Sequence, residues 1–154
     1  LRTAVYAVAC ITILEEIGVP VGPLLGGVAV FGIAVAFGGA LGAMARYGLS
    51  TLLFDAASNK FPYATLTANV LGSLAVGIVY VVIVEKAMLP PEMRSLLMVG
   101  FLGAFTTFST FSLDALGLWQ NGHLALALAY VLGTVVLCLA AVTIAVWLTG
   151  LFLN

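Results

Sequence analysis

One short apolar stretch of the chain carries an unusual density of hydroxyl groups. Within seven residues it holds Thr106, Thr107, Ser109, Thr110 and Ser112, interleaved with Phe108 and Phe111. The small residues Gly100, Gly103 and Ala104 precede this cluster and weaken the helix there. A break at this point would expose main-chain carbonyls, which attract cations, at an interface or a cavity. Packing of helices through hydroxyls and small residues is the alternative interpretation.

Two further polar tracks lie in apolar surroundings. Asn69 can donate from its amide to an anion, and Thr65, four residues earlier, lies on the same helical face. An intramembrane asparagine also serves as an interhelical hydrogen-bonding group, so both roles stay open. Tyr130, Thr134 and Cys138 recur every four residues and form a weakly polar stripe, for which chance placement is the alternative.

Charged residues near these tracks are few. Arg46 closes a glycine-rich segment in which Gly38 and Gly42 have the small-xxx-small spacing of close helix pairs. Its side chain either snorkels to the interface or faces a vestibule, where it would concentrate anions. Asp114 is the one acid near the hydroxyl cluster, and His123 is interpreted as a solvated turn residue. The sequence has no His, Cys, Asp or Glu group with metal-ligand spacing and no phosphate-binding loop, so we expect no enzyme.

Composition places these residues in a membrane. The chain has 154 residues, of which 64% are hydrophobic and 7% are charged, far from the roughly 25% charged residues of soluble domains. Four segments are long enough to span a bilayer, at about 24–45, 63–84, 96–118 and 124–148. The connections are expected at 46–62, a polar loop with one amphipathic turn, at 85–94 and at 121–123. The net charge of -1 gives no basic surface for nucleic acid.

The first 23 residues are a separate problem. The apolar run 3–14 is too short for a span and ends at Glu15 and Glu16. We expect residues 1–23 to form an accessory or interfacial helix, with a half-inserted segment or an added fusion piece as alternatives. Residues 24–154 would then form the four-helix transmembrane domain.

Positive charge normally sets membrane orientation, but here it is nearly balanced. With four spans, Arg46 and Lys60 fall on one side, while Lys86 and Arg94 fall on the other, and only Arg2 breaks the tie. A chain without orientation bias can insert both ways. Dual topology, with oppositely oriented copies paired as an antiparallel homodimer, is therefore a hypothesis.

Three strings of the sequence closely resemble the Fluc/CrcB family of fluoride channels. They are GGALGAMARY at 38–47, TLTANVLG at 65–72 and GFLGAFTTFSTFS at 100–112, and the third is the most specific. The resemblance runs from about residue 28 to the C-terminus. It implies small four-span subunits that insert in both orientations and form antiparallel dimers with two pores.

The resemblance also implies roles for individual residues. The third helix would break at 103–106, and the main-chain carbonyls of Gly103 and Thr106 would hold a structural sodium ion shared by two subunits. The fluoride pathway would include Asn69, Phe108, Phe111, Ser109, Thr110, Tyr130 and Thr134. Arg46 would sit toward a vestibule. Two positions depart from the family pattern: Cys138 stands where a hydroxyl is expected, and Ala104 replaces a frequent glycine.

The expected function is a fluoride-selective channel in a prokaryotic cell membrane that lets fluoride leave passively and so relieves its toxicity. Fluoride is strongly hydrated, and neutral donors can replace its water without trapping it. A small dual-topology exporter of another substrate, driven by a gradient, is the alternative. A third reading is an assembly protein that conducts no ions.

Overall fold

Apolar helices make up the regular structure of the described chain. The computed structural model describes residues 2–54, 61–90 and 92–153. Four helical segments in them are long and apolar enough to cross a membrane, namely Val21–Leu53, Tyr63–Glu85, Glu92–Gln120 and Leu124–Phe152. The four predicted spans are therefore confirmed. The chain divides into two compact units, Leu1–Ile33 and Ala34–Asn154.

Unit 1 contains α1 (Arg2–Glu16) and the first part of α2 (Val21–Phe54). None of the α1 residues is buried within the described chain. Gly18, with φ 86°, makes the turn between the two helices. Pro23 lies in the first turn of α2, where a proline is tolerated because the missing N–H would have no helical partner.

The end of α2 differs from the prediction. The sequence indicated a loop from Arg46 onward, whereas α2 continues to Phe54 and holds Arg46 inside the helix. The segment after Arg46 contains Leu49 and Leu52, contains no proline, and completes its backbone hydrogen bonds by remaining helical, as an apolar environment demands. The rest of the predicted loop, at 55–60 and including Lys60, lies outside the described residues.

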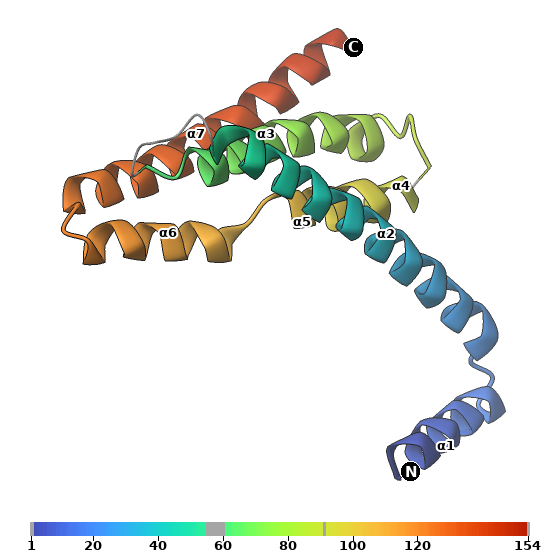
Figure 1. The fold of residues 1–154 in the computed structure, drawn as a ribbon. Coiled ribbons are helices and arrows are strands. Elements are labelled where there is room, and N and C mark those ends of the chain that lie inside the picture. The colour runs from blue at the N-terminus through green and yellow to red at the C-terminus, as the bar shows by residue number, and fades with distance from the viewer. Residues whose placement is uncertain (1, 55–60, 91, 154) are drawn as a thin grey trace. The chain divides into compact units, whose positions relative to one another are not determined.

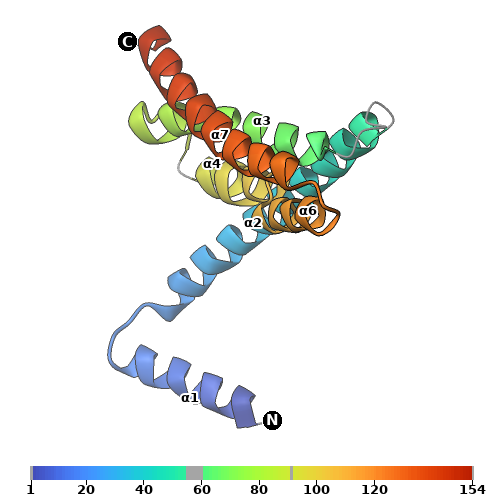
Figure 2. The same ribbon diagram turned by 90° about the vertical axis from the view of Figure 1, so that its left-hand side faces the viewer.

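Unit 2 is built on the pair α3 (Tyr63–Tyr80) and α7 (Leu124–Phe152), which lie side by side in both ribbon views (Figures 1 and 2). The π-helical segment η1 (Val81–Glu85) continues α3. At Gly77 a Cβ atom would stand 2.8 Å from the Cβ of Ala145, so only glycine permits this approach. The buried residues of α7 are spaced by three, four or seven positions, which places them on one helical face, and are Ala127, Tyr130, Thr134, Ala141 and Ala145.

The third span is divided into several segments. It runs through α4 (Glu92–Arg94), the π-helical η2 (Ser95–Leu102), α5 (Gly103–Phe105) and α6 (Phe108–Gln120). Between α5 and α6, Thr106 has ψ 159° and Thr107 has φ −153° and ψ 123°, so both are extended rather than helical. A turn with Gly122 at φ 80° then leads to α7, at the predicted position.

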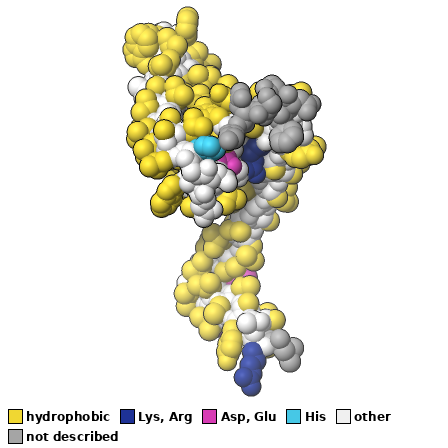
Figure 3. Space-filling view, turned by 60° about the vertical axis from the view of Figure 1, so that its left-hand side comes forward, with side chains coloured by type: hydrophobic (Ala, Val, Ile, Leu, Met, Phe, Trp, Pro, Cys, Tyr) yellow, Lys and Arg dark blue, Asp and Glu magenta, His cyan; other side chains and the backbone are white. Residues whose placement is uncertain are grey.

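Within unit 2, α2 packs on η2 through glycine. A Cβ atom added at Gly38 would overlap the carbonyl oxygen of Leu96, and one at Gly42 would overlap that of Phe101. The close approach predicted from the spacing of Gly38 and Gly42 is confirmed. Hydrophobic side chains cover most of the face drawn in Figure 3, as a surface in contact with lipid requires. The chain is a multi-pass membrane protein.

Candidate functional site

A cavity of about 440 Å³ opens in unit 2 among α3, the interrupted third span and α7. We call it the main cavity. It brings together six of the predicted site residues: Asn69, Gly103, Thr106, Phe108, Phe111 and Thr134. Hydroxyl, amide, aromatic and main-chain groups line it, and none of the side chains lining it carries a formal charge.

Asn69 forms a two-point clamp on the interruption of the third span. Its Nδ2 donates to the Thr107 carbonyl at 3.1 Å, and its Oδ1 accepts from the Thr107 N–H at 2.8 Å. The extended backbone at Thr107 is thus held by a side chain from α3. One hydrogen of the amide NH2 is not needed for the clamp. The amide therefore acts as an interhelical group and lines the main cavity at once.

At this interruption two main-chain carbonyls lack their usual helical donors. In a continuous helix the N–H of Thr107 would donate to the Gly103 carbonyl, but it donates to Asn69 instead. The N–H of Thr110 would reach the Thr106 carbonyl, but it donates to the Thr107 hydroxyl at 3.3 Å as a helix N-cap. Both carbonyls are on residues that line the main cavity. Carbonyl oxygens released in this way are suitable ligands for a hard cation.

Aromatic rings form one wall of the main cavity. Phe111 is 6% exposed, and its ring centroid lies 5.5 Å from that of Phe108 and 5.2 Å from that of Tyr130. Phe108 lines the same cavity, and 78% of its surface is exposed. Aromatic edges carry partial positive charge and can favour an anion without a full charge.

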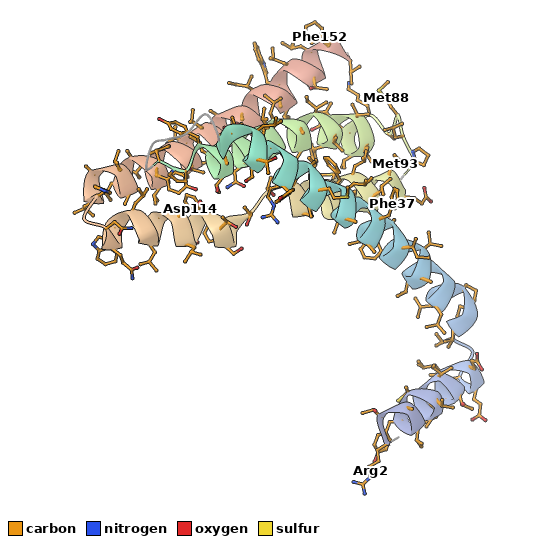
Figure 4. The ribbon with its side chains drawn as sticks, viewed as in Figure 1. Arg2, Phe37, Met88, Met93, Asp114 and Phe152 are labelled. Atoms are coloured by element: carbon orange, nitrogen blue, oxygen red, sulfur yellow. The ribbon has the colours of Figure 1, made fainter. Side chains whose placement is uncertain are left out.

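Asp114 joins the second and fourth spans. Its Oδ2 accepts a hydrogen bond of 2.7 Å from the hydroxyl of Thr65 on α3 and one of 3.3 Å from the hydroxyl of Tyr130 on α7. Figure 4 labels Asp114 on α6, beside α7. Asp114 lies within the span Glu92–Gln120 and is half-buried, so an ionisable side chain stands inside the third span.

From the sequence, Thr65 was placed on the same polar track as Asn69, but Asp114 was given no role in the site. The signal for Asp114 was available, because Asp114 follows Phe111 by three residues and so shares a helical face with a predicted site residue. What the sequence could not supply was the contact between α3 and α6. That contact decides which hydroxyls meet the carboxylate.

Thr134 is the one buried side chain of the described residues whose polar atom has no partner. It is 5% exposed, lines the main cavity, and its Oγ1 makes no hydrogen bond. A buried hydroxyl without a partner is energetically unfavourable, by about 1–3 kcal/mol, unless an ion or water meets it. Thr134 thus places an unpartnered hydroxyl in the wall of the main cavity.

The remaining predicted residues lie elsewhere. Arg46 and Thr110 line a smaller cavity of about 230 Å³ together with Thr65 and Thr107. Of these, Thr65 hydrogen-bonds the Asp114 carboxylate, and Thr107 is the residue that Asn69 holds. Ser109 is exposed and hydrogen-bonds Thr107 at 3.3 Å, and it lines neither cavity. Tyr130 is fully buried behind the ring of Phe111.

Four helices long enough to span a membrane, three of which line a cavity of uncharged donors, define a membrane protein that handles a small ion or solute. The family model described as CrcB-like protein, Camphor Resistance (CrcB), matches residues 33–146. The chain is 60% identical over 117 residues to the fluoride-specific ion channel FluC of Saccharophagus degradans, covering 76% of this chain and 87% of that protein. It is 52% identical over 121 residues to the fluoride-specific ion channel FluC of Hahella chejuensis, and this match covers 79% of this chain and 95% of that protein. The chain belongs to the CrcB family, a family of ion channels.

A second family model matches the N-terminal part of the chain. Residues 1–39 match the model described as mechanosensitive ion channel, transmembrane helices 2/3. This match and the CrcB match meet at residues 33–39, next to the boundary between the two structural units at Ile33 and Ala34. Unit 2 thus carries the CrcB sequence.

Proposed function

We propose that the protein is a fluoride-selective channel that mediates passive fluoride efflux across the cell membrane. Membership of the CrcB family and the identity to proteins named fluoride-specific ion channel carry this conclusion. The uncharged lining of the main cavity agrees with it, because a channel must replace the water of a small anion with donors that also release it. Fluoride detoxification is the benefit to the cell.

The pathway follows the donors of the main cavity. Asn69 offers its second amide hydrogen, Thr134 its unpaired hydroxyl, and Phe108 and Phe111 their ring edges. Thr110 would extend the polar track into the smaller cavity, which would serve as a vestibule where Arg46 attracts anions. Ser109 and Tyr130 line neither cavity and would support the track through Thr107 and Phe111, which they contact. Asp114 orients Thr65 and Tyr130 by accepting from both.

The functional unit is an antiparallel dual-topology homodimer in which the interrupted third span lies at the subunit interface. Two observations support this. Phe108 is 78% exposed and the apolar segments of the span expose most of their residues, so a subunit alone leaves its cavity wall open. The basic residues also show no orientation bias. A reporter fused to the C-terminus should be found on both sides of the membrane, and a single location would contradict the proposal.

A structural sodium ion bound by the Gly103 and Thr106 carbonyls would stabilise the interruption. Sodium fits these two carbonyls because the N–H groups that would donate to them in a continuous helix donate to Asn69 and to the Thr107 hydroxyl instead. Carbonyl oxygens suit a hard monovalent cation, which would tie the two ends of the break together. The sodium ion would be structural and would not be transported. It would affect fluoride flow only by fixing the shape of the break.

Residues 1–23 would act as an accessory segment at the membrane interface. The exposed side chains of α1 include Val5, Tyr6 and Ile13, which favour the boundary with lipid, while Glu15 and Glu16 end the helix at the polar side. A protein that lacks residues 1–23 should still reach the membrane and conduct fluoride. Loss of conduction from a folded truncated protein would make this segment part of the channel.

Growth in fluoride tests the function in cells. Bacteria that lack their own fluoride export should regain growth in fluoride when they express the full chain. The same cells should not be rescued by Asn69→Asp, which places a carboxylate in the cavity. Failure of the wild-type protein, when it is present in the membrane in normal amount, would contradict the proposal.

A further inference from the structure

Cys138 brings a thiol to the main cavity. It is a free, half-buried cysteine one helical turn beyond Thr134 on α7, and both side chains line the cavity. The other cysteine, Cys10, lies on α1 in unit 1. A thiol differs from the hydroxyls around it in being a soft ligand for thiophilic metal ions.

The surroundings of Cys138 indicate that a ligand fits beside it. The Thr134 hydroxyl is 5% exposed and has no partner, so the cavity contains a polar group that a bound species would satisfy. The cavity of about 440 Å³ admits a metal ion with its remaining ligands. Met98, from η2 on the third span, adds a thioether to the same lining, so soft donors come from two helices.

We propose that Cys138 is the anchor of a binding site for a soft thiophilic metal ion, such as Hg²⁺ or Ag⁺, in the main cavity, and that occupation of this site blocks the cavity. In the binding step the S–H bond of Cys138 breaks, the sulfur bonds the metal, and the proton leaves to water. No electron transfer is required. With mercuric chloride, one chloride leaves as the sulfur binds. The block of ion flow depends on the proposed function, whereas binding of the metal does not.

The test uses the full-length protein in liposomes, treated with mercuric chloride. The mass of the intact protein reports metal binding, and fluoride efflux, expressed relative to each protein's own untreated rate, reports the block. In the wild-type protein we expect mercury on Cys138 besides any on the exposed Cys10, loss of most of the efflux, and recovery with dithiothreitol. Cys10→Ser should carry one mercury and show the same block, and Cys138→Ser should lose both the cavity adduct and the block.

A matched control separates the cavity from the lipid face. Val136 is 63% exposed and lies about 200° around α7 from Cys138, so its side chain points elsewhere. The double variant Cys138→Ser with Val136→Cys should bind mercury without losing efflux. Met98→Leu should keep the adduct but require more mercury for the same block, because one soft donor is missing.

Each outcome decides something. Absence of mercury on Cys138 overturns the site, and a full adduct on Cys138 with unchanged efflux overturns the block. An equal block in the Val136→Cys variant would also overturn it. If Cys138→Ser fails to fold, Cys138→Ala replaces it, and the mass of the wild-type adduct still tests the site. If untreated wild-type protein shows no efflux while Cys138 binds mercury, the site stands and the channel function fails.

Discussion

Asn69 is the residue whose two hydrogen bonds explain most about the site. It holds the extended backbone of Thr107 from both sides and faces the main cavity at the same time. Asn69 also takes the N–H that would donate to the Gly103 carbonyl in a continuous helix, and the Thr107 hydroxyl takes the one that would donate to Thr106, so the two together create the proposed cation site. One side chain thus links the shape of the break, the anion pathway and the sodium proposal.

Replacing Asn69 by aspartate tests this link. Asn69→Asp keeps an acceptor for the Thr107 N–H but removes the donor to the Thr107 carbonyl and adds negative charge. We expect fluoride efflux to fall by about tenfold or more, since repulsion of an anion by more than 1.4 kcal/mol suffices for that factor. Asn69→Gln, which keeps the amide, is the control. Wild-type efflux in Asn69→Asp would remove Asn69 from the pathway.

Asp114 makes a separate prediction about stability. Tyr130 is fully buried, and its hydroxyl and that of Thr65 both donate to the Asp114 carboxylate. Asp114→Ala leaves these hydroxyls without an acceptor and should lower the free energy of unfolding by about 1–3 kcal/mol. Asp114→Asn keeps one acceptor oxygen and should lose less. Unfolding of purified protein in detergent, followed by circular dichroism, measures the difference, and equal stability of Asp114→Ala and wild type would contradict it.

At the level of the helices, the close approach of α2 and η2 depends on glycine. A Cβ atom at Gly42 would overlap the Phe101 carbonyl, whereas Gly48, on the same helix, has no atom within 4 Å of such a position. Gly42→Leu should therefore destabilise the fold by roughly 1–3 kcal/mol through overpacking. Gly48→Ala should stay within about 1 kcal/mol of wild type. Thermal unfolding of both variants decides this, and equal midpoints would mean that the helices can separate freely.

Much of the helix arrangement could be predicted because it follows from local rules. Span number follows from the length of apolar runs, and the turn at Gly122 and the glycine contact follow from residue type and spacing. The end of α2 was missed because an arginine in a helix and an arginine after one look alike in sequence. The role of Asp114 was missed because its partners come from two other helices, and pairing of helices is a tertiary property.

At the level of the whole molecule, a sodium ion in the proposed position would tie together the two parts of the third span. If binding occurs only in the folded state, sodium at about 100 times its dissociation constant would add about 2.7 kcal/mol of stability. The midpoint of thermal unfolding should then rise with sodium and not with N-methylglucamine at equal ionic strength. The same midpoint in both salts would remove the ion from the account.

The family assignment concerns unit 2, and the balance of basic residues is the basis for the proposed antiparallel homodimer. In the proposed channel, conduction would unite these features, because the clamp, the aromatic wall and the unpaired Thr134 hydroxyl would all serve a passing anion. A gradient-driven exporter would instead couple transport to a carboxylate such as Asp114.

Fluoride efflux from liposomes that contain the purified protein is the measurement that decides whether this protein is a fluoride channel. Chloride is the control anion, and a potassium ionophore clamps the charge. The account predicts rapid release of fluoride without chloride, with no proton gradient required. No release from folded dimers, or equal release of chloride, would contradict the claim that this protein is a fluoride-selective channel.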